Sequence, residues 1–95
     1  MLSYDLYVLN GRAHVEPNKL EIRKMKNRWG SCSTKGRILL NLELIKAPKA
    51  CIEYVIIHEL CHLVHRDHTK AFFDLQQREF PEWKKWKNKL EILLA

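Results

Sequence analysis

The sequence predicts an α+β fold: a small, largely antiparallel sheet of about three strands, packed against one central helix and followed by C-terminal helices. Three observations predict it. Apolar and polar residues alternate in the first half of the chain, which is typical of strands with one buried face. The apolar run at residues 51–64 is too long for a strand. The remaining C-terminal residues place apolar side chains at helical spacing.

The three strands are expected at residues 20–25, around 31–33 and at 37–42. In the first of them, apolar and charged residues alternate except at the last step. Lys35-Gly36 separates the second and third segments and is a turn signal, so these two strands are predicted to form a hairpin.

Helices are expected on both sides of these strands. Residues 2–12 place leucines roughly on one face, and residues 48–64 form the central helix. A proline opens the central helix, where its missing N–H has no intrahelical partner to lose. Thr69 can cap a further helix over residues 70–79. The last helix, over residues 82–94, has tryptophans and leucines on one face and lysines on the other.

Length and composition bound the class of protein. The 95 residues are expected to form one domain, residues 1–95, with a modest core. No apolar run approaches the roughly 20 residues of a membrane span, and the first residues lack the pattern of a signal peptide. Cys32, Cys51 and Cys61 have no C-x-x-C spacing, so they are expected to be reduced thiols in the cytoplasm. Cys51 and Cys61 are expected to be small core residues.

The chain is basic, with a formal net charge of +6 and a pI near 9.4. This charge permits an acidic partner, including nucleic acid. The basic residues are spread along the chain, which favours an ordinary solvated surface, although Lys84, Lys85, Lys87 and Lys89 form a local excess. The oligomeric state is not indicated.

The segment from His58 to His62 has the form H-E-x-x-H. Two histidines four apart on a helix share one face, roughly 6 Å apart along the axis, so both imidazoles can reach one metal ion. Glu59 projects to the side, where it can deprotonate a water molecule as general base. Ionisable groups in so apolar a segment are costly unless they are paired or bind metal. The motif therefore predicts a zinc site; a pair of hydrogen-bonded core histidines is the alternative.

A catalytic zinc needs a third protein ligand, for which four residues are candidates. His65 lies roughly 10 Å along the helix axis from His58, too far for convergence on a straight helix. Glu79 and Glu82 are possible, although each is also a plausible surface carboxylate. His68 gives H-E-x-x-H-x-x-x-x-x-H, in which the helix stops and the chain turns back, and it is the preferred third ligand.

Several segments together resemble the YgjP-like metallopeptidases, a family of small zincins similar in motif to the SprT proteases. They are Lys-Asn-Arg-Trp-Gly-Ser-Cys-Ser at residues 26–33, Leu-Asn at 40–41, Ala-Pro at 47–48, the motif segment 54–62, and His68. Within the first segment, Trp29 is expected to be a core anchor and Gly30 a requirement of the backbone.

The resemblance implies a zincin-like α+β fold, zinc ligands His58, His62 and His68, and Glu59 as catalytic base. It also implies a peptide or protein substrate that lies extended along a sheet edge, and residues 37–42 are the expected edge. The expected reaction is peptide-bond hydrolysis through a zinc-bound water.

Other side chains are candidates for support. Ligand histidines need an acceptor for their second ring nitrogen, and Asn41 and Glu53 are candidates. Arg28 or Ser31 could assist the oxyanion from the sheet side. Tyr54, one turn before His58, could do so as well, although core packing is the simpler expectation.

Two other functions stay open. The first is a metal-dependent hydrolase of a non-peptide substrate such as a nucleotide, with Arg28, Arg37 and the lysines holding phosphates. The second is a nucleic-acid-associated module, in which the zinc is mainly structural and the last helix contacts the nucleic acid.

Overall fold

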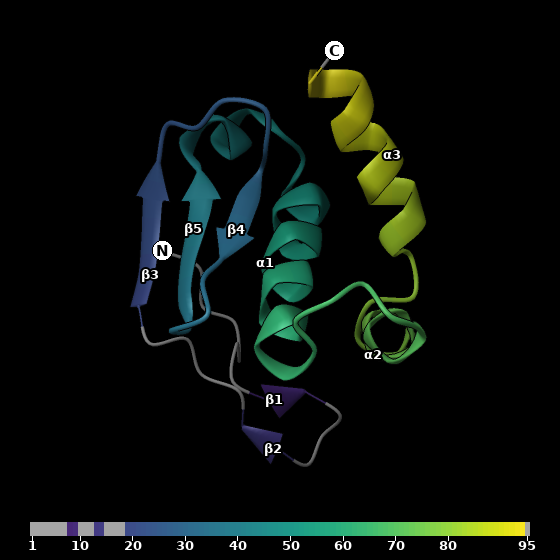
Figure 1. Ribbon diagram of the computed structural model, residues 1–95. Coiled ribbons are helices and arrows are strands. Elements are labelled where there is room, and N and C mark those ends of the chain that lie inside the picture. The colour runs from purple at the N-terminus through teal and green to yellow at the C-terminus, as the bar shows by residue number, and fades with distance from the viewer. Residues whose placement is uncertain (1–7, 10–12, 15–18, 95) are drawn as a thin grey trace.

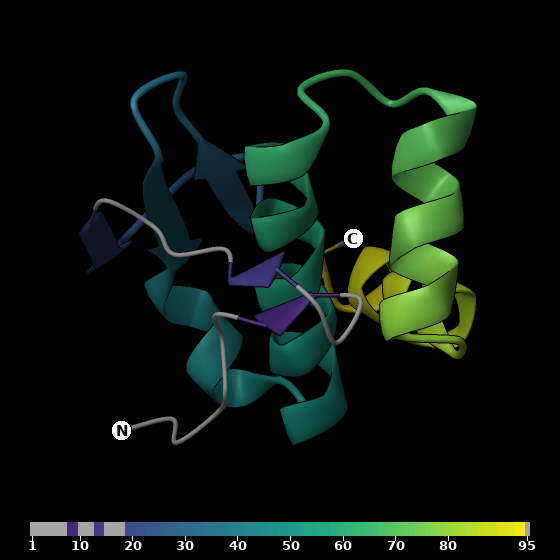
Figure 2. The same cartoon turned by 90° about the horizontal axis from the view of Figure 1, so that it is seen from below.

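The computed structural model of the chain describes residues 8–9, 13–14 and 19–94. Its elements follow in the order β1 (Val8–Leu9), β2 (Ala13–His14), β3 (Lys19–Arg23), β4 (Gly30–Cys32), β5 (Arg37–Asn41), the 3-10 helix η1 (Leu42–Lys46), α1 (Lys49–Val64), α2 (Lys70–Glu79) and α3 (Trp83–Leu94). In Figures 1 and 2, α1 lies between the β3-β5-β4 sheet on one side and α2 and α3 on the other. This arrangement confirms the predicted α+β class.

The sheet has the strand order β3-β5-β4, so β5 is its central strand. β4 and β5 pair antiparallel, with Ser31 opposite Leu39, which confirms the predicted hairpin. The turn between them contains Gly36 with φ of 82°. Glycine adopts this left-handed conformation without steric cost, whereas other residues rarely do.

β3 and β5 pair in parallel, with Leu20 opposite Ile38 and Ile22 opposite Leu40. The prediction of a largely antiparallel sheet is therefore wrong for this pair, and the sheet is mixed. The alternation of residues predicts which face of a strand is buried, but it carries no information on strand direction. The expectation that residues 37–42 form a sheet edge is also wrong, because β4 and β3 flank β5 and form the two edges.

α1 confirms the helix predicted over residues 48–64, and β4, β5, η1, α2 and α3 pack against it. Pro48 takes the N-cap position, with φ of −55° and ψ of 148°, and its carbonyl accepts the Cys51 N–H at 2.9 Å. The buried side chains of α1 are Cys51, Tyr54, Val55, Ile56, Glu59, Leu60 and Cys61. Because several of them are consecutive, α1 is buried on both its sheet side and its helix side.

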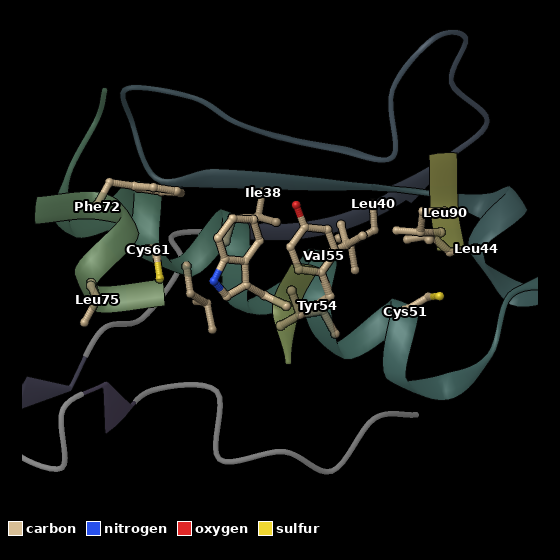
Figure 3. Close-up of a cluster of buried hydrophobic side chains, with 13 residues drawn as sticks. Ile38, Leu40, Leu44, Cys51, Tyr54, Val55, Cys61, Phe72, Leu75 and Leu90 are labelled. Atoms are coloured by element: carbon tan, nitrogen blue, oxygen red, sulfur yellow. The ribbon is translucent and has the colours of Figure 1, made fainter. Parts of the chain in front are cut away.

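The core follows the length of α1. Figure 3 shows Phe72 and Cys61 at one end of the buried cluster, and Cys51 and Leu90 at the other. Cys51 and Cys61 are free thiols with no exposed surface, which confirms their prediction as small core residues. Cys32, by contrast, is only partly buried.

α2 and α3 also confirm their predictions. The Thr69 hydroxyl accepts the Phe72 N–H at 3.4 Å and caps α2. On α3, Trp83 and Leu90 are buried, but Leu93 is 48% exposed, so the buried face is shorter than predicted. In Figure 1 the last turn of α3 extends past the start of α1, which leaves it little to pack against. Neither α3 nor any other helix among the described residues is long and apolar enough to cross a membrane.

The lysines of α3 lie on its outer surface, as predicted. Lys84 and Lys85 lie over the rings of Trp83 and Trp86, at 5.6 Å and 4.8 Å from the ring centroids. The two ammonium groups thus make cation–π contacts with the indoles at the surface of α3. Nucleic-acid binding by this face stays a prediction.

The helix expected over residues 2–12 is wrong where the structure describes it. Val8–Leu9 forms β1 and pairs antiparallel with Ala13–His14 of β2. The sequence between these two segments contains Asn-Gly at residues 10–11, the dipeptide that is the strongest signal for a hairpin turn. The rest of that prediction lies outside the described residues.

Candidate metal centre and active site

Three histidine rings meet beside the C-terminal end of α1. His58 and His62 project from successive turns of α1, and His68 comes from the loop that leads to α2. The candidate ligand nitrogens of the three rings all lie within 4.8 Å of one another. His62 Nε2 and His68 Nε2 are 3.1 Å apart. Two nitrogens on one tetrahedral zinc ion lie about 3.3 Å apart, so the three rings fit such an ion with little movement.

The structure brings His68 into this cluster, but not the other candidates for a third ligand. Glu79 and Glu82 are not in the His58–His62–His68 group that the described residues form. His65 follows the last residue of α1, and its backbone N–H bonds the Cys61 carbonyl at 2.9 Å. His65 is not in the ligand group that the described residues form, which agrees with the rise of the helix.

The loop after α1 turns the chain back toward the helix. The Thr69 N–H bonds the Asp67 carbonyl at 2.8 Å, a backbone bond that tightens the turn around His68. Arg66 ties the same loop to the sheet, since its guanidinium donates to the carbonyls of Ser33 at 3.1 Å and Cys32 at 3.4 Å. These contacts fix where His68 can project.

The second ring nitrogens of the helical histidines have acceptors. His58 Nδ1 lies 2.7 Å from Gln76 Oε1, and His62 Nδ1 lies 3.2 Å from the His65 carbonyl oxygen. An oxygen of either kind only accepts, so each Nδ1 carries the proton and each Nε2 keeps its lone pair for the cluster. Burial lowers the pKa of His58 to about 4 and lowers that of His62 as well, so both rings are neutral near pH 7.

The acceptors proposed from the sequence are wrong. Asn41 is buried, but its amide donates to the carbonyls of Met25 and Arg28, at 3.0 Å and 2.8 Å. Its side-chain oxygen accepts the Glu43 N–H at 3.0 Å and caps η1. Glu53 is not the acceptor either. The sequence did hold a signal for Gln76, because it lies four residues after Phe72 on the buried face of α2, where a polar residue needs a partner.

Glu59 is 5% exposed and faces the same space as the histidines. Burial raises the pKa of its carboxyl to about 7, and the positive charge of Arg28 opposes this rise. The cavity has a volume of about 280 Å³, and Glu59 lines it together with the three histidines and the motif residues Arg28, Gly30, Ser31 and Cys32. A carboxyl group with a pKa near 7 in the same cavity as the three imidazoles is what a general base at a metal site requires.

Tyr54 does not line this cavity; it is 7% exposed and belongs to the core, as the simpler expectation had it. Arg28 and Ser31 do line the cavity, on the side of β4. Trp29 is partly buried and packs against the core, which confirms it as an anchor.

Comparison with known proteins agrees with this geometry. The profile of the YgjP-like metallopeptidase domain matches residues 2–92. The chain belongs to the YgjP-like metallopeptidase family. Its structure is similar to that of the metallopeptidase zymogen abylysin from Pyrococcus abyssi, with a TM-score of 0.72, 28% identity and coverage of 80% of this chain and 77% of that one. The family and the zincin-like fold predicted from the sequence are thus confirmed.

Two further relatives were found. The metallopeptidase zymogen jannalysin from Methanocaldococcus jannaschii has a TM-score of 0.70 and 25% identity, over 84% of this chain and 83% of that one. A UTP pyrophosphatase from Escherichia coli (strain K12) is 26% identical over 68 residues, which are 70% of this chain. The matched part is 41% of that enzyme's length, so the chain corresponds to less than half of it.

Proposed function

We propose that this chain is a cytoplasmic zinc metallopeptidase, one domain over residues 1–95, that hydrolyses peptide bonds. The observation that supports this most is the convergence of His58, His62 and His68 with a buried glutamate in one cavity. Three neutral imidazoles are a known ligand set for catalytic zinc, and they leave a fourth position open. Similarity to two metallopeptidase zymogens agrees with the reaction class.

The roles of the chain's own residues follow from the geometry. The metal, when bound, supplies Lewis-acid activation of the attacking water and of the scissile carbonyl. Glu59 accepts the proton of the attacking water and passes it to the leaving amine, and a pKa near 7 suits both transfers. Arg28 lines the cavity from the sheet side and can donate to the carbonyl oxygen as negative charge develops there.

The substrate would bind along β4 rather than along β5. β4 is an edge strand, and its residues Gly30, Ser31 and Cys32 line the cavity. A peptide added to its free edge would place a scissile bond opposite Glu59 and the histidines, held by main-chain hydrogen bonds.

A second candidate function is hydrolysis of a nucleotide. Arg28 and Arg66 both line the cavity, and the similarity to a UTP pyrophosphatase points to a phosphate-bearing substrate. The same activated water could attack phosphorus, while guanidinium groups neutralise the phosphate oxygens. Arg37, on β5, does not line the cavity, and its guanidinium pairs at 3.4 Å with Glu21 on the neighbouring strand β3.

The deciding experiment compares substrates. Zinc-loaded chain is assayed against casein-derived peptides and against nucleoside triphosphates, with Glu59→Gln as the matched inactive variant. Peptide cleavage that is lost in Glu59→Gln supports the peptidase. Triphosphate hydrolysis that is lost in the same variant, without peptide cleavage, moves the assignment to the second candidate. Turnover that Glu59→Gln retains in full does not depend on Glu59 and contradicts the proposed role of this residue in both candidates.

A further inference from the structure

Gln76 is the one polar side chain that the described part of α2 buries completely, with 0% exposure. It lies on α2, whereas the ring it contacts, His58, belongs to α1. The Gln76 Oε1 lies 2.7 Å from His58 Nδ1, and the Gln76 Nε2 is buried without a hydrogen-bond partner. An amide donor left unsatisfied in a core is costly, and an aliphatic residue of similar volume would avoid this cost. The contact to His58 is therefore the feature that explains a glutamine here.

The orientation of the Gln76 amide decides what His58 presents to the cluster. With Oε1 toward the ring, Nδ1 carries the proton and Nε2 has a free lone pair. With the amide turned over, its NH₂ group would face Nδ1, the proton would move to Nε2, and this nitrogen could not bind a cation. One side chain thus selects between a competent and an incompetent ligand.

Phe72, one turn earlier on α2, also contacts the histidine rings. Its ring is fully buried and lies 5.0, 4.5 and 5.0 Å from the ring centroids of His58, His62 and His68. An aromatic ring in contact with all three imidazoles restricts how far each can rotate. Figure 3 shows Phe72 at the end of the core cluster beside Cys61, where α2 meets α1.

We infer that Gln76 is a positioning residue, which holds His58 in the Nδ1-protonated tautomer and so prepares the three-histidine site before a metal ion arrives. This inference rests on the metal site of the proposed function and adds the residue that sets the affinity of that site. It assigns α2 the role of a preformed support, with Phe72 as its apolar part and Gln76 as its polar part.

The test uses two substitutions at Gln76 and one at its neighbour. Gln76→Leu removes the acceptor, and Gln76→Glu keeps an acceptor in the same place. Gln77→Leu is the matched control: Gln77 is exposed, and its amide contacts Trp83 Nε1 at 2.8 Å and the Pro81 carbonyl at 3.3 Å, away from the histidines. Two quantities are measured on the full chain: the ¹⁵N chemical shifts of the His58 ring in metal-free protein, and zinc affinity by chelator competition.

In the metal-free wild type, His58 should give the shifts of an Nδ1-protonated ring. Gln76→Leu should mix the tautomers and weaken zinc binding by about 10- to 100-fold. Gln76→Glu should keep the Nδ1-protonated tautomer and the zinc affinity of the wild type. Gln77→Leu should leave both quantities unchanged, even if it lowers thermal stability. An Nε2-protonated His58 in the wild type would overturn the inference, and so would wild-type affinity in Gln76→Leu.

The two proposals can fail separately. If no variant binds zinc, the proposed function fails, but the ring shifts of the metal-free wild type still decide whether Gln76 selects the tautomer. If Gln76→Leu does not fold, the inference is tested by the ¹⁵N shifts of His58 in the wild type and by the zinc affinity of Gln76→Glu. A Gln76→Glu variant that folds, has a mixed His58 tautomer and binds zinc weakly would contradict the inference.

Discussion

A Cβ atom at Gly30 would lie 3.2 Å from Glu59 Oε2. The same atom would also lie 3.0 Å from Val55 Cγ1 and 3.1 Å from the Leu39 carbonyl oxygen. These contacts are tighter than ordinary packing, and all three neighbours belong to regular elements, Leu39 to β5 and the other two to α1. Glycine is thus needed because β4 passes close to the face of α1 that carries the proposed general base.

Gly30→Ala should therefore impair hydrolysis more than metal binding. Relief of the contacts moves β4 or the Glu59 carboxylate by a few tenths of an ångström. We expect a loss of stability of about 1–3 kcal/mol and a fall in kcat of about 10-fold or more. Urea unfolding and steady-state kinetics at saturating zinc check the two parts. Unchanged kcat together with lower stability would show that Gly30 serves packing alone.

Glu59 predicts a specific pH dependence of stability in the metal-free protein. Burial raises its folded pKa to about 7, above the value of about 4.3 for an exposed glutamate. The folded state therefore holds the proton more tightly, and stability is lost as the pH rises from about 4 to about 7, where the unfolded chain ionises first.

Glu59→Gln removes this penalty. Relative to wild type, the metal-free variant should gain up to about 3 kcal/mol between pH 4 and pH 8. Urea unfolding of both proteins across this pH range, with chelator present, measures the difference. Parallel curves for the two proteins would mean that the carboxyl is not held in a water-poor site.

His68→Ala should weaken zinc binding strongly, because one of three donors is lost from the cluster. The adjacent His65→Ala is the control, since only the backbone carbonyl of His65 contacts His62. Elemental analysis after dialysis should give about one zinc per chain for wild type and His65→Ala, and far less for His68→Ala. Zinc held tightly by His68→Ala would transfer the third position to Glu79 or Glu82.

The two cavity arginines should distinguish anionic from neutral substrates. Arg28→Gln and Arg66→Gln should each raise the KM for a nucleoside triphosphate by about 10-fold, since a charge-assisted contact contributes about 1.5–3 kcal/mol. Arg37→Gln serves as control, because its ion pair with Glu21 lies outside the cavity. Equal effects of all three substitutions would point to net charge alone as the cause.

The sequence indicated most of the residues that the structure brings together in the candidate site, because the spacing of these residues is local. His58, Glu59 and His62 lie within two turns of one helix, so the geometry of the helix alone brings them together. His68 could be chosen because the chain has to turn back after α1 ends at Val64 to bring its imidazole to the other two. The central helix could also be predicted, since an apolar run of this length is too long for a strand.

The predictions that were wrong depend on contacts between distant segments. Gln76 reaches His58 from α2, 18 residues later, and no local pattern pairs them. β3 pairs in parallel with the side of β5 that the β4–β5 hairpin leaves open, and the alternation of residues reveals neither this pairing nor its direction. The segment that forms β1 was predicted as helix because so short a stretch fits both the helical and the strand spacing of apolar residues. Its pairing with β2 favours the strand.

The donors of the cluster come from two segments, α1 and the loop that leads to α2, and this has a thermodynamic consequence. An ion shared by both acts as a removable cross-link across that loop. Part of its binding free energy then goes into ordering the two segments. Free metal at 100 times its dissociation constant would raise the free energy of unfolding by about 2.7 kcal/mol. The zinc concentration around the protein would thus set the fraction of molecules that are folded, in addition to the fraction that is able to turn over substrate.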